Sequence, residues 1–428
     1  MDEKSGTLTA NAGPLSITTE ETPQLVENPE EGLHQPAHDA APPKEDLSAW
    51  LQVLGVFLPQ PEHLTYYELD FLRSYTSSNI AWIGSTQAFL LFLVSIVAGP
   101  ICDLGYVLPL LYVGSVLLVV GFFLVSITSA YWQVFLTQAV MMGLGFGCLY
   151  VPAPTIVSQY FHASTALAMG VSSAGSAVGG VIFPIIFSQL QPRVGFRWAT
   201  RTLAFILLIT SIIPLLVMKG TPRRRTRNIL DRDAFKDIPY LLLTLGFFFG
   251  FMGLYIVFYY IQLFALERTN ASSNLSEYLL VIINGSSLVG RIICGYYADK
   301  IGSVNMQTAM VLISAILTFC MLAIRTAAPL VVFSVLYGFS AGAFMGLPGA
   351  GIVSLSPDKS KIGTRLGMTL SVVGIGLLVS NPIAGAILGE DQNWTGLVVW
   401  CGVLLFASTA SLIASRVAKV GPGLTKAI

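Results

Sequence analysis

Arg291 is the residue whose position most clearly suggests chemistry, because it lies well inside the apolar stretch 275–297. A charged side chain near the middle of a bilayer costs about 2.5–3.5 kcal/mol on insertion scales, so such a residue generally faces a cavity or a partner. The guanidinium could therefore attract an organic anion. A second interpretation is equally open: the nearby Lys300 marks the end of this stretch, and the Arg291 side chain could extend to the aqueous surface.

Two tyrosines, Tyr255 and Tyr259, are four positions apart in the stretch 239–264 and would share one face of a helix. They could line a cavity that takes an aromatic or carboxylated organic molecule. The alternative is anchoring at the outer membrane surface, where tyrosine is enriched. Tyr260 fits the anchoring interpretation better, and Tyr255 fits the cavity better.

A patterned group of small and charged residues, Gly290-Arg291-x3-Gly295-x3-Asp299-Lys300-x-Gly302, covers the end of the stretch 275–297. Gly295 would let two helices approach closely because it has no side chain. Asp299, followed by Lys300, could face a helix terminus or a cation and hold one side of the molecule shut. A shorter copy with Gly99 and Asp103, without the basic residue, ends an earlier stretch. Because the element occurs twice at corresponding positions, a gate is favoured over an ordinary polar turn.

Enzymatic and metal chemistry are not predicted. The run 338–342 matches the nucleophile-elbow pattern, but it lies in an apolar stretch and no histidine or acid accompanies it. The four histidines show no metal-ligand spacing, and the five cysteines form no CxxC pair. A net charge of zero gives no sign of a nucleic acid partner. We therefore expect no catalytic residues, no metal and no cofactor.

The composition indicates a protein that lives in a lipid bilayer. Hydrophobic residues make up 54% of the 428 residues and charged residues only 11%, whereas a soluble domain usually carries about 25% charged residues. A membrane-crossing helix needs about 20 apolar residues. Eleven stretches meet that requirement, at 80–101, 107–128, 131–154, 165–188, 198–218, 239–264, 275–297, 303–324, 329–353, 364–388 and 395–415. The predicted fold class is an all-α multi-pass membrane protein.

A twelfth apolar run, 49–58, is too short to cross a bilayer and is followed by Pro59 and Pro61. We treat it as a truncated first span, which is either a true short form or the result of a lost segment. The preceding residues 1–48 are rich in Glu, Pro, Gly, Ser and Thr, and they are predicted to form a disordered tail.

The distribution of basic residues predicts the orientation. The connection 219–238 carries seven Lys and Arg residues, and the C-terminal residues 416–428 add three more, so this side should be cytoplasmic. Glycosylation sequons begin at Asn270, Asn274 and Asn393, all on the opposite side, where sugars can be attached. The sequon at Asn284 lies inside a span and should be unused. We expect the cell membrane rather than an internal membrane.

The two halves of the chain repeat one another. An offset of 196 aligns Gly99 and Asp103 with Gly295 and Asp299. An offset of 199 aligns Thr165, Leu167, Met169, Ser172 and Gly175 with Thr364, Leu366, Met368, Ser371 and Gly374. Matches in this order indicate duplicated halves. The predicted regions are a tail 1–48, a first bundle 49–218, a basic cytoplasmic linker 219–238, a second bundle 239–415 and a cytoplasmic tail 416–428.

The glycine–aspartate pattern resembles the loop signature of the major facilitator superfamily. The segments Ala49-Trp50-Leu51-Gln52-Val53-Leu54-Gly55, Tyr160-Phe161 and Ala168-x-Gly170-x3-Ala174-Gly175-Ser176-x2-Gly179-Gly180 are similar to those of its monocarboxylate-transporter family, especially the fungal branch. The resemblance implies two pseudo-symmetric helical bundles. It also implies that an Arg at position 291, with an Asp four positions earlier, handles a substrate anion and a proton. Ser287 stands at that Asp position here, so the anion role carries over to Arg291 and proton coupling stays open.

These patterns together predict a secondary transporter that moves a small organic solute, such as a carboxylate or a secondary metabolite, by alternating access. The residues 80–218 would rock against 239–415. An alternative is a non-transporting membrane sensor or an inactive relic, which the truncated first span would explain. An enzyme is a distant third.

Overall fold

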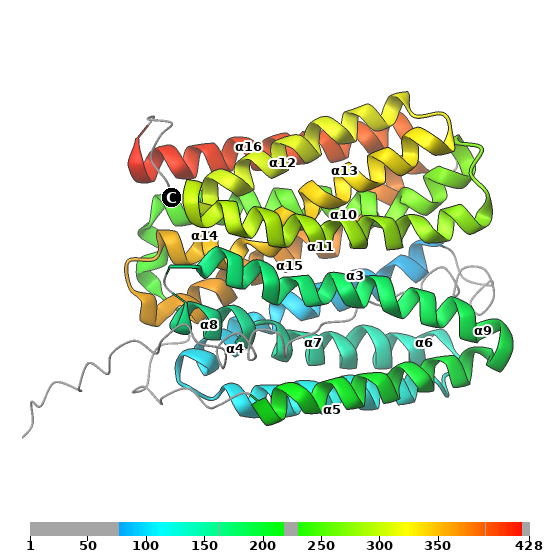
Figure 1. Ribbon diagram of the computed structural model, residues 1–428, viewed down its shortest axis with the longest axis horizontal. Helices are drawn as coiled ribbons and strands as arrows, with labels where there is room; N and C mark the ends of the chain where they lie inside the picture. The colour runs from blue at the N-terminus through cyan, green and yellow to red at the C-terminus, as the bar shows by residue number, and fades with distance from the viewer. Residues whose placement is uncertain (1–76, 162, 218–229, 390, 422–428) are drawn as a thin grey trace, which may run out of the picture. The chain divides into compact units, whose positions relative to one another are not determined.

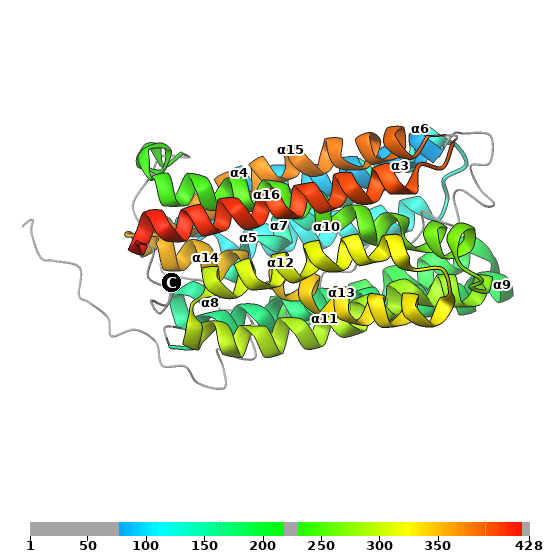
Figure 2. The same cartoon turned by 90° about the horizontal axis from the view of Figure 1, so that it is seen from above.

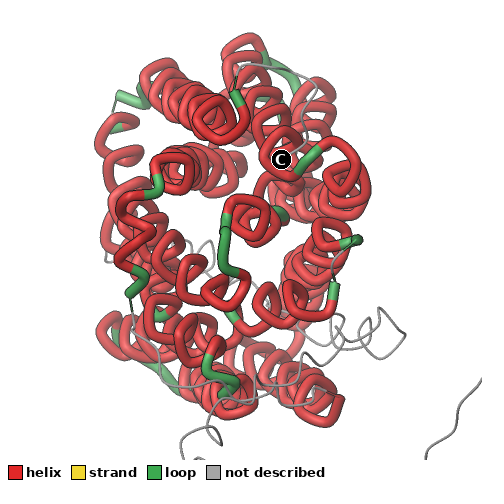
Figure 3. Tube along the Cα trace, turned by 90° about the vertical axis from the view of Figure 1, so that its left-hand side faces the viewer, coloured by secondary structure: helices red, strands yellow, loops and turns green. Residues whose placement is uncertain are grey.

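The computed structural model describes residues 77–161, 163–217, 230–389 and 391–421. These residues form helices and short connections, with no β-strand among them (Figure 3). All described helices belong to one compact unit. Predictions for the tail 1–48, the truncated span 49–58, most of the linker and the last residues of the C-terminal tail lie outside the described residues.

The first half runs from α3 to α9. Its elements are α3 (Ser77–Leu93), α4 (Ser95–Asp103), α5 (Val107–Val125), α6 (Tyr131–Val134), the π-helix η3 (Phe135–Met142), α7 (Gly143–Tyr150), α8 (Pro152–Tyr160) and α9 (Thr165–Val217). Figures 1 and 2 show the long helices running roughly side by side, with α4 continuing α3 and α8 continuing α7.

The second half runs from η4 to α16. Its elements are the 3-10 helix η4 (Arg232–Lys236), α10 (Ile238–Arg268), α11 (Ser273–Ile301), α12 (Ser303–Cys320), the 3-10 helix η5 (Met321–Ala323), α13 (Ala327–Gly346), α14 (Pro348–Leu355), the 3-10 helix η6 (Lys359–Lys361), α15 (Ile362–Leu388) and α16 (Trp394–Val420). We call the end that holds η4, α8 and α14 the linker end.

The expected spans are confirmed among the described residues. Ten helical segments are long and apolar enough to cross a membrane, and one of them, 165–212, has 48 residues. That length is about twice what one crossing needs. Gly195 has φ of 74° inside α9, a backbone conformation that ends a regular helix. Thus α9 consists of two helices, and the described residues contain eleven helical segments long and apolar enough to cross. The loop expected at 189–197 is therefore mostly helical.

Two prolines break their spans at corresponding points of the repeat. Pro152 begins α8 and Pro348 begins α14, and in each case a single residue separates the proline from the end of the preceding helix. Proline has no N–H to donate and its ring collides with the preceding turn, so it is favoured at the start of a helix and breaks the interior. The expected spans 131–154 and 329–353 therefore each consist of consecutive helices rather than one straight helix.

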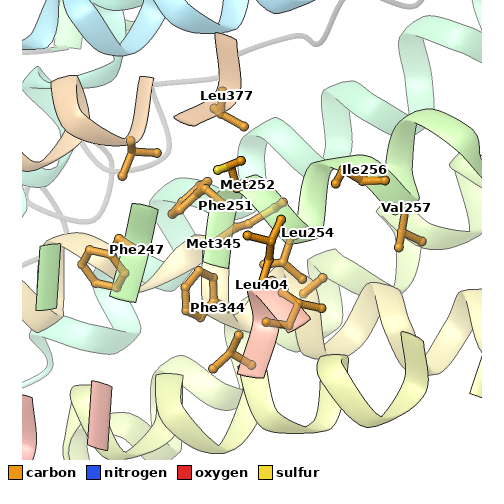
Figure 4. Packing of buried hydrophobic residues seen from close by; sticks show 14 of the residues in the cluster. Phe247, Phe251, Met252, Leu254, Ile256, Val257, Phe344, Met345, Leu377 and Leu404 are labelled. Carbon is orange, nitrogen blue, oxygen red and sulfur yellow. The ribbon is translucent and has the colours of Figure 1, made fainter. Parts of the chain in front are cut away.

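Aromatic and aliphatic side chains pack densely where α10, α13, α15 and α16 meet (Figure 4). The rings of Phe247 and Phe344 lie 5.8 Å apart, and those of Phe251 and Phe344 lie 5.6 Å apart. Between helices in a membrane such packing is the main attraction, because lipid tails are as apolar as the side chains.

The two halves meet along two seams, α9 with α11 and α3/α4 with α15. Glycines allow the close approach. A methyl group at Gly170 would collide with the carbonyl group of Arg291, and one at Gly99 would collide with that of Gly363. In one seam α4, which ends at Asp103, packs against α15, which begins beside Thr364. In the other seam α11, which ends just after Asp299, packs against α9, which begins at Thr165. A two-fold relation between the halves would produce this reciprocal pairing of helices.

Candidate functional site

Arg291 lies in the α9–α11 seam, and only 6% of its surface is exposed. One guanidinium nitrogen, Nη1, donates hydrogen bonds to the carbonyl oxygen of Ser173 and, at 2.5 Å, to Oγ of Ser176. Both serines belong to α9 of the other half. Gly346 of α13 leaves room for the aliphatic part of the side chain, since a Cβ there would lie 3.0 Å from Cγ of Arg291.

The direction of the Arg291 side chain argues against one of the two sequence interpretations, extension to the aqueous surface. The backbone of Arg291 packs against Gly170, but its guanidinium reaches Ser173 and Ser176, which lie farther along α9 from the linker end. At 1.5 Å per residue, Ser176 is about 16 Å along the helix from its first residue, Thr165. The side chain therefore points toward the middle of the bundle and does not extend to the aqueous surface.

Two buried donors on α11 have no hydrogen-bond partner within the described residues. They are Nε of Arg291 and Oγ of Ser287, one helical turn apart on the same face. Gly342 provides the space for Ser287, because a side chain at Gly342 would collide with the serine. Leaving a buried donor unsatisfied costs about 1–3 kcal/mol. An acceptor group of a bound molecule, such as a carboxylate, would recover that cost.

Tyr255 lies near one of these donors, the guanidinium of Arg291. Its ring is half-buried and stacks on Phe251, with ring centroids 6.2 Å apart. Tyr255 and Tyr150 are both near enough to Arg291 for electrostatic interaction. The prediction that Tyr255 and Arg291 belong to one site is therefore consistent with their positions in the structure.

The first half contributes aromatic rings to the same region. Phe92 of α3 lies 5.5 Å from the ring of Tyr150 and 5.8 Å from that of Phe251. An aromatic cluster thus spans both halves beside Arg291. Sequence reasoning missed Phe92, Tyr150 and Phe344, because aromatic residues occur throughout the apolar stretches and no spacing distinguishes these.

Tyr259 and Tyr260 lie farther along α10. Their rings are 5.2 Å apart, and Tyr259 is half-buried. Tyr260 is 9% exposed and donates a hydrogen bond of 3.4 Å to the carbonyl oxygen of Asn381 in α15. The anchoring interpretation of Tyr260 is wrong in this structure, since its side chain is enclosed between two helices of the protein.

Asp103 lies at the end of α4 and contacts the first turn of α15. Its carboxylate accepts hydrogen bonds from the backbone N–H of Gly363 at 3.0 Å, and from the N–H and the hydroxyl of Thr364, both at 2.7 Å. A helix N-terminus carries unpaired N–H groups and a partial positive charge, so it binds a carboxylate well. Close contact between Gly99 and Gly363 brings the two helices together for this bond.

Asp299 makes the corresponding contact at the other seam. It accepts hydrogen bonds from the backbone N–H groups of Ala166 at 2.7 Å and Leu167 at 2.9 Å, in the first turn of α9. Gly295 lies against the carbonyl oxygen of Ala166. Lys300 does not join this contact: its Nζ donates to the hydroxyl of Tyr296 at 2.8 Å and lies 4.1 Å from the ring centroid, on the exposed side of α11.

The three sequons expected to carry sugars lie at the end of the bundle opposite Asp103 and Asp299. Asn270 and Asn274 are exposed around the start of α11, and Asn393 is exposed at the start of α16, where its Oδ1 accepts from the N–H of Gly396 at 2.8 Å. Asn284 is buried in the α9–α11 seam and donates to the carbonyl oxygen of Gly180 at 3.3 Å. Its enclosure fits the expectation that this sequon is unused.

No cluster of potential metal ligands occurs within the ranges that the structure describes. The groups brought together between the halves are instead a buried guanidinium with an unsatisfied Nε, one unsatisfied serine hydroxyl and an aromatic cluster. These can bind a molecule that combines an acidic group with an aromatic or apolar body.

Comparison with known families and proteins adds independent information. The family model of the Major Facilitator Superfamily matches residues 48–347. An MFS-type transporter, dbaD, of Emericella nidulans is 40% identical over 83% of this chain and 83% of that protein. The aspyridones efflux protein apdF of the same organism is 36% identical over 84% of this chain and 74% of its own. The fujikurins efflux protein of Gibberella fujikuroi is 35% identical, with 96% and 93% covered.

A solved structure gives the same architecture. The chain resembles the crystal structure of a Major Facilitator Superfamily transporter, FucP, in the outward conformation, with a TM-score of 0.62 at 14% sequence identity. The match covers 86% of this chain and 97% of the other. At this identity the likeness concerns the fold alone.

Proposed function

Because this chain belongs to the Major Facilitator Superfamily and is a multi-pass membrane transporter, we propose that it exports a small, acidic secondary metabolite from the cell. Two relatives are described as efflux proteins, for aspyridones and for fujikurins, and they support export as the direction. In this proposal the protein acts at the cell membrane.

One observation carries the chemistry of the cargo: the guanidinium of Arg291 is enclosed between the halves with its Nε unsatisfied. In the proposal an acidic group of the cargo accepts from Arg291 and from Ser287. The rings of Tyr255 and, farther along α10, Tyr259 contact its aromatic or apolar body. Ser287 supplies no carboxyl group that could carry a proton beside Arg291, so the proposal includes no proton step at that position.

The gate of the proposed cycle is the pair of aspartates at the linker end, which we place on the cytoplasmic side. Asp103 with Gly99 and Asp299 with Gly295 would close that side, and rocking of the halves would break both contacts. Each carboxylate at a helix N-terminus contributes typically 0.3–1 kcal/mol, and more when partly buried. Contacts of this size can hold a closed state and still release it when the cargo binds.

Two earlier interpretations receive less support. The relatives named above are described as MFS-type transporters and efflux proteins, not as monocarboxylate porters, so a monocarboxylate cargo remains only one form of the proposal. The sensor or relic interpretation is not favoured, since the chain matches these transporters over most of their length. The family is also not one of enzymes.

The test compares an aromatic carboxylic acid with its methyl ester in proteoliposomes that contain the purified protein. We expect the acid to be transported at least tenfold faster than the ester, because only the acid offers an anion to Arg291. Arg291→Ala should remove this preference, whereas Arg268→Ala, an exposed residue at the opposite end of the bundle, should keep it. Equal transport of acid and ester by the unaltered protein would refute the proposal.

A further inference from the structure

The first turn of α15 is held from two sides. From the first half, Asp103 accepts hydrogen bonds from the backbone of Gly363 and Thr364. From the residues that lead into α10, Asp231 accepts from Nζ of Lys361 at 2.8 Å and from Nε of Arg365 at 3.0 Å. Asp231 therefore holds the two residues that flank the ones Asp103 contacts.

The contacts of Asp231 are enclosed. The side chain of Asp231 is 3% exposed and that of Arg365 is 4% exposed. Arg365 also donates to Asp237 at 2.8 Å, so one guanidinium joins both ends of the short segment 231–237, which we call the linker strap. Enclosed ion pairs with hydrogen bonds hold their geometry far better than exposed ones, and removal of one partner leaves the other charge buried and unpaired.

The start of α10 completes this arrangement. The hydroxyl of Tyr240 donates to the carbonyl oxygen of Arg365 at 2.8 Å, and the guanidinium of Arg365 lies 5.1 Å from the ring centroid of Tyr240. Thr369 donates to the same Tyr240 hydroxyl at 2.9 Å. The strap, the start of α10 and the start of α15 therefore form one rigid corner of the second half. The bonds of Asp103 cross between the halves, whereas those of Asp231 do not.

We infer that Asp231 and Arg365 are positioning residues for the gate, which hold the first turn of α15 in the orientation that Asp103 needs to close the linker end. The linker strap is then part of the closing device. The turn that Asp299 contacts has no counterpart of Arg365, because the sequence from Leu104 to Pro192, which includes this turn, contains no Asp, Glu, Lys or Arg. The consequence for transport rests on the proposed function, but the consequence for the distance between the halves does not.

The experiment measures the separation of the halves directly. Spin labels are attached at Tyr106→Cys, after α4, and at Lys359→Cys, before α15, in a background whose native cysteines are replaced. We expect Asp231→Asn to increase the population with the longer distance at least tenfold. The matched control is Asp233→Asn, since Asp233 is in the same strap and 3.4 Å from Lys361 but 81% exposed. Identical distance distributions for the two variants would overturn the inference.

A double-mutant cycle separates positioning from general stability. If Asp231 acts through Asp103, then Asp231→Asn should change the distances little when Asp103→Asn is already present. Independent, additive shifts would contradict the inference. Thermal unfolding of each variant is measured in detergent. If Asp231→Asn does not fold, the conservative Arg365→Lys replaces it as the test. This variant keeps the positive charge but cannot bond Asp231 and Asp237 through two separate nitrogens, so it should shift the distances in the same direction.

Transport of the acidic probe then distinguishes the two proposals. If the strap favours closure, Asp231→Asn should lower KM for substrate added at the linker side, because more molecules are open there. The same variant should lower kcat, because the return to the closed state is slower. If no acid is transported but the distances shift, the strap is retained and the proposed cargo is rejected. If transport is normal and KM and kcat do not change, the strap has no role in the gate.

Discussion

Single residues at the linker end differ in how strongly they hold the halves together. Asp103 is 8% exposed and accepts three hydrogen bonds, one of them from a hydroxyl. Asp299 occupies the corresponding place in the repeat, where it accepts hydrogen bonds from backbone N–H groups, but its side chain is exposed. Hydrogen bonds to a charged group contribute more when water is excluded. The two seams are therefore unequal although the sequence pattern is duplicated.

This inequality predicts different effects of removing each charge. Asp103→Asn should reduce the closed population about 10- to 100-fold, since a hydrogen bond to a charged group contributes about 1.5–3 kcal/mol. Asp299→Asn should have a smaller effect, because water screens the exposed carboxylate. Spin-label distances across each seam measure both. Equal shifts would show that burial does not decide the strength of these contacts.

The pH dependence of the linker strap follows from Asp231. Burial alone would raise the pKa of this carboxyl, but hydrogen bonds from Lys361 and Arg365 outweigh burial and lower the pKa below its ordinary value. A group with a lowered pKa stabilises the folded state above its unfolded pKa, and this contribution is lost as pH falls through the folded pKa. We therefore expect the distance between the labels to stay constant from about pH 7.5 to about pH 5.5. A change within that range would contradict the ion-pair description.

At the scale of elements, close contact between helices depends on glycines at particular points. The α9–α11 seam contains Gly170, where a methyl group would meet the backbone of Arg291, and Gly285, where the nearest atom to a Cβ would be 4.0 Å away. Backbone atoms cannot move aside as a flexible side chain can, so only the first position is sterically closed. Gly285 therefore serves as a matched control for Gly170 within the same seam.

Gly170→Ala should separate α9 from α11 and reduce transport at least tenfold, because the hydrogen bonds from Arg291 to Ser173 and Ser176 need this approach. Gly285→Ala should leave transport within about twofold of the unaltered protein, because ordinary surface or loosely packed substitutions cost within about 0.5 kcal/mol. Both are measured by uptake of the acidic probe into proteoliposomes, with the amount of folded protein determined by size-exclusion chromatography. Unchanged transport by Gly170→Ala would show that α9 and α11 do not need this close contact.

At the scale of the whole molecule, the halves are arranged so that each contributes to the same central region. The first half supplies Phe92 and Tyr150, and the second supplies Phe251, Tyr255 and Arg291. A cargo held there would contact both halves at once, which is the condition for coupling its binding to their rocking. The orientation of this arrangement in the membrane is the remaining large-scale feature, and it has a direct test.

The orientation predicts which sequons carry sugars when the protein is made in a eukaryotic host. Asn270→Gln, Asn274→Gln and Asn393→Gln combined should abolish the mass lost on glycosidase treatment, because these residues are exposed at the end opposite the gate. Asn284→Gln should leave that mass unchanged, because Asn284 is buried in the seam. Electrophoresis before and after treatment measures the effect. Persistence of the mass loss in the triple variant would place sugars elsewhere.

The sequence by itself determined the class of fold and the apolar spans of the described residues. Runs of about 20 apolar residues can cross a bilayer only as helices, because backbone groups in lipid must bond within their own segment. The sequence also singled out Arg291, Asp103 and Asp299, since charges are rare in such runs and so are conspicuous.

The tertiary structure alone decided which residues meet across the halves. It directed Arg291 to Ser173 and Ser176, enclosed Tyr260, turned Lys300 away from the seam and joined Asp231 to Arg365. These contacts link residues more than a hundred positions apart, with the exception of Lys300, so no local spacing encodes them. In a membrane nearly every helix face is apolar, and the pattern that would reveal the inward face of a soluble helix is largely missing.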